Sequence, residues 1–244
     1  MDISLTPASP KVELRNVDLR YFGLTGETEA IKDISLSIAP GEFVAIIGQS
    51  GCGKSTLLSL ISGILQPTGG AVLVDGKPVT GPSRKVGYML QQDYLFEWRT
   101  ILENTLLGAE IQGTPLAKAR ERATQLLTRY GLGQFLNHLP RQLSGGMRQR
   151  VALARTLCTE PDIVLLDEPF SALDSQTRLA LADEITEILR REEKTVILVT
   201  HDIGEAVSMA ERVIVVSRRL KARVFFQPAC EQRQRRTRKR TEDY

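Results

Sequence analysis

The segment EFVAIIGQSGCGKST, residues 42–56, carries the strongest structural signal in the chain. Its first half, residues 42–48, is almost continuously apolar, which is typical of a strand that is buried on both faces. Its second half, residues 48–56, matches the pattern G-x-x-x-x-G-K-[ST] and runs into the apolar segment TLLSLISGI. A buried strand, a glycine-rich turn and a helix in this order predict a phosphate-binding loop in an α/β protein.

The chemistry of this loop indicates a nucleotide ligand. Glycine residues let the backbone approach phosphate closely, and the N–H groups at the following helix N-terminus attract negative charge. Lys54 is suited to reach the β- and γ-phosphates, and the Ser55 hydroxyl can hold Mg²⁺. We therefore expect the nucleotide to contact the loop residues Gly48, Gln49, Ser50, Gly51, Cys52, Gly53, Lys54, Ser55 and Thr56.

Two carboxylates follow another buried strand. The segment IVLLD, residues 163–167, predicts a strand, and ligands of open α/β sheets bind at the carboxyl ends of strands. Asp167 is suited to direct or indirect contact with Mg²⁺, and Glu168 to polarising a water for in-line attack on the γ-phosphate. Because neighbouring strand residues point to opposite faces, we expect the two carboxylates to have different roles.

Two further segments resemble anion-contacting sites. His201 follows the predicted strand at 195–200 and can donate a hydrogen bond to a γ-phosphate oxygen. The segment LSGGMRQR, residues 143–150, predicts a helix with a flexible lead-in, where Ser144 can cap the first turn. This helix start has the chemistry of an anion site, although Lys54 already marks a complete phosphate loop far upstream.

The order of predicted elements indicates the fold class. Segments 12–20 and 34–38 alternate apolar and polar residues like half-buried strands, whereas later strands alternate with helices. Strand–helix alternation predicts a largely parallel α/β core. Residues 93–155 are helical in character and predict a subdomain inserted into that core. The chain holds no internal repeat, so we expect one such domain per chain.

Together these motifs resemble the ATP-binding subunit of an ABC transporter. The resemblance covers residues 11–217 and includes LQQD at 90–93 and SALD at 171–174. It implies the ABC ATPase fold, which is a P-loop NTPase core of α/β type with an antiparallel β subdomain and an inserted α-helical subdomain. It also implies an ATPase that uses ATP and Mg²⁺, in which Lys54 and His201 assist Glu168.

The resemblance also explains the second anion site. Two subunits of this family pair head to tail, and each ATP lies between the phosphate loop of one copy and the LSGG signature of the other. Ser144, Gly145 and Gly146 would therefore bind the ATP of a second copy of the chain. A two-fold symmetric pair forms two such sites at once.

The family pattern assigns further contacts residue by residue. Gln91 would contact Mg²⁺ and the attacking water and sense a membrane partner, with Gln92 as the neighbouring alternative. Asp174 would cross the dimer interface. Tyr21 would stack on adenine, with Phe22 as the alternative.

Two details resemble importers of the nitrate, sulfonate and taurine type, namely Trp98 in YLFEW and Met147 in the signature, whereas Glu97 departs from an expected proline. Such systems use an extracytoplasmic binding protein and a permease. We therefore expect ATP hydrolysis to energise import of a small anion through a partner permease. The alternative is the ATPase subunit of another ABC transporter, with a different substrate or an export function.

Composition and charge exclude several other classes. The chain is 42% hydrophobic and 25% charged, as globular proteins are, and it shows neither a signal peptide nor an apolar run of about 20 residues. We expect a permease to hold it at the cytoplasmic face of the membrane. Residues 218–244 carry ten Lys or Arg against three acidic residues and predict a disordered, solvated tail. No sustained heptads separate the motifs, which argues against a DNA-acting relative, and we expect no nucleic-acid partner.

Overall fold

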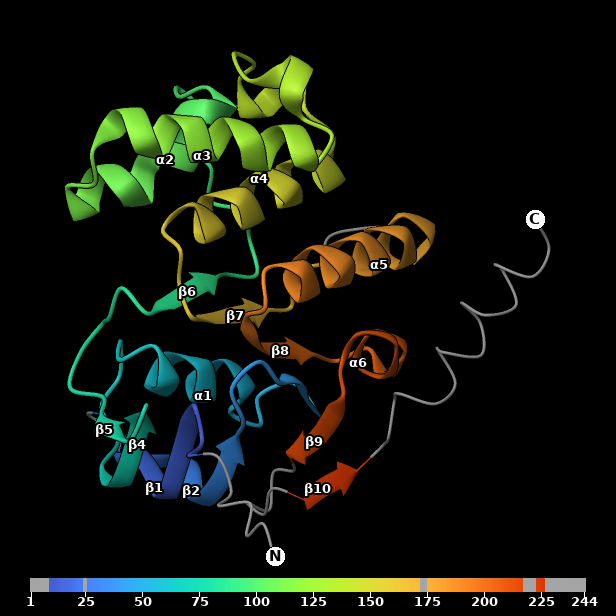
Figure 1. Cartoon of the computed structure of the whole chain (residues 1–244). Coiled ribbons are helices and arrows are strands. Elements are labelled where there is room, and N and C mark those ends of the chain that lie inside the picture. Colours follow the sequence, from blue (N-terminus) through green and yellow to red (C-terminus); the bar gives the residue numbers. More distant parts are fainter. Residues whose placement is uncertain (1–8, 24–25, 172–174, 217–222, 227–244) are drawn as a thin grey trace, which may run out of the picture. The chain divides into compact units, whose positions relative to one another are not determined.

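The computed structural model describes residues 9–23, 26–171, 175–216 and 223–226 (Figure 1). They fold into two compact units. The first unit combines the described residues up to 83 with those from 195 onward, and the second comprises the described residues between 84 and 194. The polypeptide thus leaves the first unit once and returns to it. The finer boundaries expected from the sequence, 11–217 with a helical part at 93–155, stay predictions.

The first unit contains an antiparallel sheet with strand order β2-β1-β4-β5 (Figure 1). Buried Val12, Leu14 and Val17 on the first strand direct one face of this sheet into the core. The first two strands are longer than the segments 12–20 and 34–38 that the sequence pattern predicts. The strands of this sheet span Val12–Gly23 (β1), Gly26–Ile38 (β2), Gly69–Val74 (β4) and Lys77–Pro78 (β5).

Parallel strands of the first unit carry the phosphate loop. The strand β3 (Phe43–Gly48) pairs in parallel with β8 (Thr195–Thr200) on one side and with β9 (Arg212–Val216) on the other. All residues of β8 are buried, which explains the apolar run at 196–199 between its two terminal threonines. Helix α1 (Lys54–Ile61) follows β3 and α6 (Ile203–Met209) follows β8, so both helices begin near the carboxyl ends of parallel strands.

The second unit is mainly helical. Its helices α2, α3 and α4 pack against one another, and α5 also contacts α4 (Figure 1). Two short strands, β6 (Val86–Met89) and β7 (Ile163–Asp167), pair in parallel. The helices span Ile101–Gln112 (α2), Leu116–Arg129 (α3), Gly145–Cys158 (α4) and Ser175–Arg191 (α5), with 3₁₀ turns at Gly133–Phe135 and Pro140–Gln142.

The end of the chain differs from the predicted disordered tail at residues 223–226. These residues form β10 (Arg223–Phe226), which pairs antiparallel with β9. The sequence Val-Phe-Phe at 224–226 favours a strand, and a charge count over the whole segment obscures this local preference. The rest of the tail lies outside the described residues. Within the described part of the chain, no helix is both long and apolar enough to cross a membrane.

Candidate functional site

Two glycines shape the phosphate loop of the first unit. A Cβ atom on Gly48 would lie 2.3 Å from the carbonyl oxygen of Val216 and 2.7 Å from Sγ of Cys52, so the end of β3 has room only for glycine. Gly53 caps α1 with a φ of 93°, in the left-handed region that other residues rarely adopt. Between them, Gln49, Ser50 and Gly51 turn the chain toward the α1 N-terminus, where the helix dipole favours an anion.

Lys54 is the buried cation of this loop. Its side chain is only 5% exposed, and its Nζ donates to the carbonyl oxygens of Gly48 at 2.9 Å and Gln49 at 3.2 Å. Because a buried ammonium needs hydrogen-bond partners, these contacts hold the charge over the loop. Ser55 and Thr56 follow on α1, with Ser55 exposed. The loop therefore combines a glycine-lined turn, a held cation and a hydroxyl, which is the chemistry that a polyphosphate with Mg²⁺ requires.

His201 lies directly after β8 and is exposed. The turn that carries it is fixed from both sides. Buried Thr200 donates through Oγ1 to Oε2 of Glu205 at 2.5 Å and accepts from the backbone N of Asp202 at 3.0 Å. Asp202 in turn caps α6 by accepting from the backbone N of Glu205. The imidazole thus extends from a turn that hydrogen bonds hold in place, and a fixed backbone of this kind suits a side chain that contacts a ligand.

The two aromatic candidates for the adenine contact lie near the end of β1. Tyr21 is 45% and Phe22 70% exposed, and they pair with Thr28 and Glu27 of β2. Either ring has the open face needed to stack on a flat base. Both residues therefore remain candidates.

In the second unit, Asp167 and Glu168 occupy different environments. Asp167 ends β7, is 7% exposed and accepts a hydrogen bond on Oδ2 from the hydroxyl of Tyr88 at 3.2 Å. Glu168 is half-buried and has a φ of 45°, so the chain leaves the strand direction at this residue. The two carboxylates thus differ in burial because the strand ends between them, whereas the sequence predicted a difference from the alternation of side chains along one strand. A non-glycine residue in the left-handed region costs energy and is often found at functional sites.

Gln91 approaches the turn that follows Glu168. Its Nε2 donates to Oγ of Ser171 at 3.3 Å, and the backbone N of Ser171 donates to the carbonyl of Glu168. Gln92 is exposed and makes no such contact among the described residues, which favours Gln91. An open cavity of about 620 Å³ is lined by Gln91, Gln92, Asp93, Tyr94, Gly145, Arg148, Gln149 and Ser171.

Ser144 caps α4, as predicted. Its Oγ accepts a hydrogen bond from the backbone N of Met147 at 3.3 Å, while Ser144 itself is exposed. Gly145 lines the cavity and Gly146 is buried in the first turn of the helix. The signature therefore presents an exposed helix N-terminus, where an anion is favoured.

Arg148 joins the signature to the segment that follows Gln91. Its Nε lies 3.0 Å from Oδ2 of Asp93, and its Nη1 donates to the carbonyl of Leu143, directly before Ser144. Sequence reasoning did not single out Arg148, although it lies within a motif that was recognised. Tyr88 was also missed, and no sequence signal identifies it, because its partner Asp167 lies 79 residues away.

The candidate residues thus fall into two groups. Lys54, Ser55 and His201 belong to the first unit, whereas Gln91, Asp167, Glu168 and the signature belong to the second. The Ser55 hydroxyl of the first unit, and the Asp167 carboxylate and Gln91 amide oxygen of the second unit, are each hard oxygen donors of the kind that Mg²⁺ prefers, so the chemistry of each side chain suits the ion. Asp174 lies outside the described residues.

Comparison with known proteins gives one consistent family. The ABC transporter domain family matches residues 31–171. The chain is 47% identical over 197 residues to an uncharacterized ABC transporter ATP-binding protein of Bacillus subtilis, covering 81% of this chain and 76% of that protein. It is 42% identical to a nitrate import ATP-binding protein of Synechocystis and 39% identical to a taurine import ATP-binding protein of Roseobacter denitrificans. Each of these two matches covers 85% of this chain and 78% of the relative.

Solved structures agree with this assignment. A dimeric ATP-binding cassette in a post-hydrolysis state, bound to ADP and Pi, matches with a TM-score of 0.77 and 36% identity. The match covers 88% of this chain and 98% of that one. The fold is accordingly that of an ABC ATPase, with an α/β core, an antiparallel β part and an α-helical part. The chain therefore belongs to the ABC transporter family and is an ATP-binding ATPase.

Proposed function

We propose that this ATPase energises the import of a small anion, such as nitrate, a sulfonate or taurine, through a partner permease. The observation that carries the proposal is the similarity to a nitrate import protein and a taurine import protein along 85% of the chain. Trp98 and Met147, which resemble that group of importers, add support from within the sequence.

The chemistry of hydrolysis follows from the two groups of residues. The loop 48–56 and Lys54 bind the phosphates and offset their charge, and His201 donates a hydrogen bond to a γ-phosphate oxygen. Glu168 orients and polarises the attacking water. Ser55, Gln91 and Asp167 would hold Mg²⁺, which neutralises phosphate charge when it is bound.

The complete reaction centre requires two copies of the chain in a head-to-tail pair. Ser144, Gly145 and Gly146 of one copy face the ATP held by the phosphate loop of the other, Asp174 crosses between the copies, and Tyr21 or Phe22 stacks on adenine. The exposed, capped N-terminus of α4 supports this arrangement, since it offers an anion site without a phosphate loop of its own. The dimeric state of the matching cassette supports it further.

The pair works at the cytoplasmic face of the membrane, where the permease holds it near residues 91–110. An extracytoplasmic binding protein delivers the anion to the permease. ATP binding closes the pair and hydrolysis reopens it, and the permease follows this motion. Gln91 lies at the start of the proposed docking region and its side chain bonds Ser171 in the turn after Glu168, so it is suited to sense the partner.

The variant Glu168→Gln tests the catalytic part of the proposal. The amide keeps the size of the side chain but cannot polarise water as a carboxylate does, so we expect ATP binding to persist while phosphate release falls by roughly 10²-fold or more. Nucleotide binding, phosphate release and the mass of the ATP-bound species are measured together, and the ATP-bound dimer should accumulate.

Glu193→Gln is the matched control, because Glu193 is an exposed glutamate of the same unit that also has a positive φ, of 51°. It should behave like the wild type. Normal phosphate release by Glu168→Gln would remove Glu168 from the proposed role. Anion import is tested separately, by reconstituting the chain with its permease and binding protein and measuring ATP-dependent uptake of labelled nitrate and taurine.

A further inference from the structure

A tyrosine at the end of α3 has a buried hydroxyl without a hydrogen-bond partner. Tyr130 directly follows α3 and is only 4% exposed. Its backbone N donates to the carbonyl of Leu126 at 3.0 Å, and Gly131, with a φ of 74°, then turns the chain away from the helix. Among the described residues, the Tyr130 hydroxyl makes no hydrogen bond. A buried hydroxyl without a partner costs free energy, and an acceptor brought by a ligand would offset that cost.

Tyr130 lines a cavity of about 300 Å³ in the second unit. The cavity lies where α4 contacts both α3 and α5 (Figure 1). It shares no lining residue with the larger cavity beside Gln91, and its volume is at the lower end of the range for small-molecule sites. The other lining residues are Arg129, Gly131, Arg150, Glu184, Glu187, Ile188 and Arg191.

The two carboxylates in the wall of this cavity are already paired with arginines. Nη2 of Arg150 lies 3.0 Å from Glu184, and Nη2 of Arg191 lies 2.5 Å from Glu187. Arg129 pairs at 2.6 Å with the glutamate that directly follows Arg191. A guanidinium group has five N–H donors and no acceptor, so each arginine keeps donors beyond those that its ion pair uses. The wall thus offers hydrogen-bond donors rather than free carboxylates.

Arg150 provides a second buried donor without a partner. Among the described residues its Nε makes no hydrogen bond, although its Nη2 is paired. A Cβ atom on Gly131 would lie 3.8 Å from Nη1 of Arg150, so the guanidinium passes close to the residue that follows Tyr130. Burial raises the pKa of Tyr130, so its hydroxyl keeps the proton that it can donate. Two unpartnered donors therefore belong to the wall of one cavity.

We infer that this cavity binds a small organic anion, a carboxylate or sulfonate with a short apolar group, whose oxygens accept hydrogen bonds from the Tyr130 hydroxyl and from Nε of Arg150. An anion fits because hydrogen bonds between a guanidinium and an oxyanion are stronger than neutral ones. The apolar group fits because half-buried Ile188 gives the wall an aliphatic side chain. The inference does not depend on the proposed function, since no residue proposed to contact ATP lines the cavity.

The experiment measures binding of sodium butyrate and sodium butane-1-sulfonate to the purified full-length chain by saturation-transfer NMR titration at constant ionic strength. Butylammonium chloride is the matched probe, because it has the same apolar group with a positive head group. We expect saturable binding of an anion and none of butylammonium. Tyr130→Phe and Arg150→Lys each remove one of the two donors, so each should weaken anion binding roughly 10-fold or more.

Two control variants and a stability measurement accompany the titration. Tyr94→Phe and Arg141→Lys make the same changes at exposed residues of the same unit that lie outside the cavity wall, and they should bind like the wild type. In the absence of a probe, Tyr130→Phe should melt no lower than the wild type, because it loses no hydrogen bond within the protein. It should, however, lose the thermal stabilisation that the anion gives the wild type.

Selective binding of butyrate or butane-1-sulfonate that weakens in both Tyr130→Phe and Arg150→Lys supports the site, and the anion that binds identifies the head group. Absence of saturable anion binding overturns the inference, as does an affinity that is unchanged in either variant. Binding of butylammonium as strong as that of the anions overturns it too, because the wall would then act through its carboxylates. A lower melting temperature of Tyr130→Phe without a probe also overturns it, since the hydroxyl would have a partner within the protein.

Discussion

Single residues set the chemistry of the phosphate loop. Lys54 is a buried charge whose partners, the carbonyls of Gly48 and Gln49, belong to the loop it serves. Its ammonium is therefore positioned before a nucleotide arrives, and little side-chain entropy is lost when it binds one. The geometry at Gly48, where a Cβ atom would collide with Val216, keeps the same loop close to the strands around it.

Lys54→Ala should therefore weaken nucleotide binding itself. Hydrogen bonds to charged groups contribute about 1.5–3 kcal/mol, so we expect ATP affinity to fall by roughly 10- to 100-fold. Titration with a fluorescent ATP analogue measures the change. Lys77→Ala, at an exposed lysine of β5, should leave affinity unaltered. An unchanged affinity in Lys54→Ala would contradict the assignment of the loop.

At the scale of elements, the α4 N-terminus combines a structural and a functional role. Ser144 caps the helix and is also the residue proposed to face the ATP of a second copy. Ser144→Asp separates the two roles, because aspartate caps a helix about as well as serine but adds a negative charge where phosphate would bind. We expect the melting temperature to be retained and ATPase activity to be lost.

Ser144→Ala serves as the reverse comparison. It removes the cap, at a cost of about 1 kcal/mol, without adding charge. Ser144→Ala should therefore have a lower melting temperature than Ser144→Asp but a higher steady-state rate of phosphate release. If Ser144→Asp hydrolyses ATP normally, the signature does not face a phosphate.

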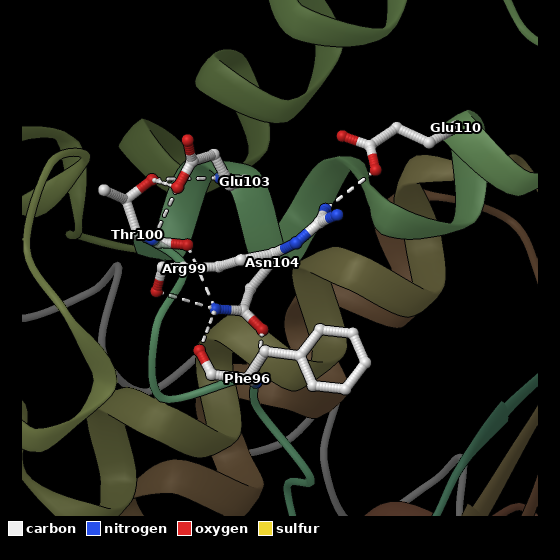
Figure 2. Close-up of polar contacts among 6 residues, drawn as sticks. All are labelled: Phe96, Arg99, Thr100, Glu103, Asn104 and Glu110. Atoms are coloured by element: carbon white, nitrogen blue, oxygen red, sulfur yellow. Dashed lines mark hydrogen bonds and ion pairs between the residues drawn. The ribbon is translucent and has the colours of Figure 1, made fainter.

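Asn104 is one of the side chains that hold the connection between β6 and α2 (Figure 2). In Asn104→Leu the backbone N–H of Phe96 loses its acceptor, so we expect the free energy of unfolding to fall by roughly 1–3 kcal/mol. Trp98 is the only tryptophan, so time-resolved fluorescence anisotropy should report faster motion of its ring. Asn137→Leu, at an exposed asparagine, should change neither quantity. Unchanged anisotropy in Asn104→Leu would show that Asn104 does not hold residues 96–99 in place.

At the scale of the whole molecule, a reaction centre shared between two copies makes a prediction about mixtures. Ser144→Asp and Glu168→Gln chains should each be inactive alone. A mixed pair, however, unites the intact Glu168 of one chain with the intact signature of the other. In a random mixture half of the pairs are mixed and each has one intact site, so up to about a quarter of the sites should regain activity. For the wild type, specific activity should fall on dilution because the pair dissociates. If mixing restores no activity, each chain acts by itself.

The motifs could be predicted from the sequence because each is local. Nine consecutive residues encode the phosphate loop, and the apolar run before Asp167 encodes the strand that delivers it. Chain order and composition likewise sufficed for the α/β class and the helical insertion. Residues 223–226 were predicted less well, because the basic residues around them dominate any count made over the whole tail.

What the sequence determined by itself is therefore the set of chemical groups and the order in which strands and helices carry them. The tertiary structure alone decided their environments. It placed the Tyr88 hydroxyl on Asp167, joined Arg148 to Asp93 and buried Asn104 where its side chain accepts from the backbone N of Phe96. The physical reason is that a hydrogen bond depends on distance and direction between two groups. For Tyr88 and Asp167, which lie 79 residues apart, only packing of the whole unit brings those groups together.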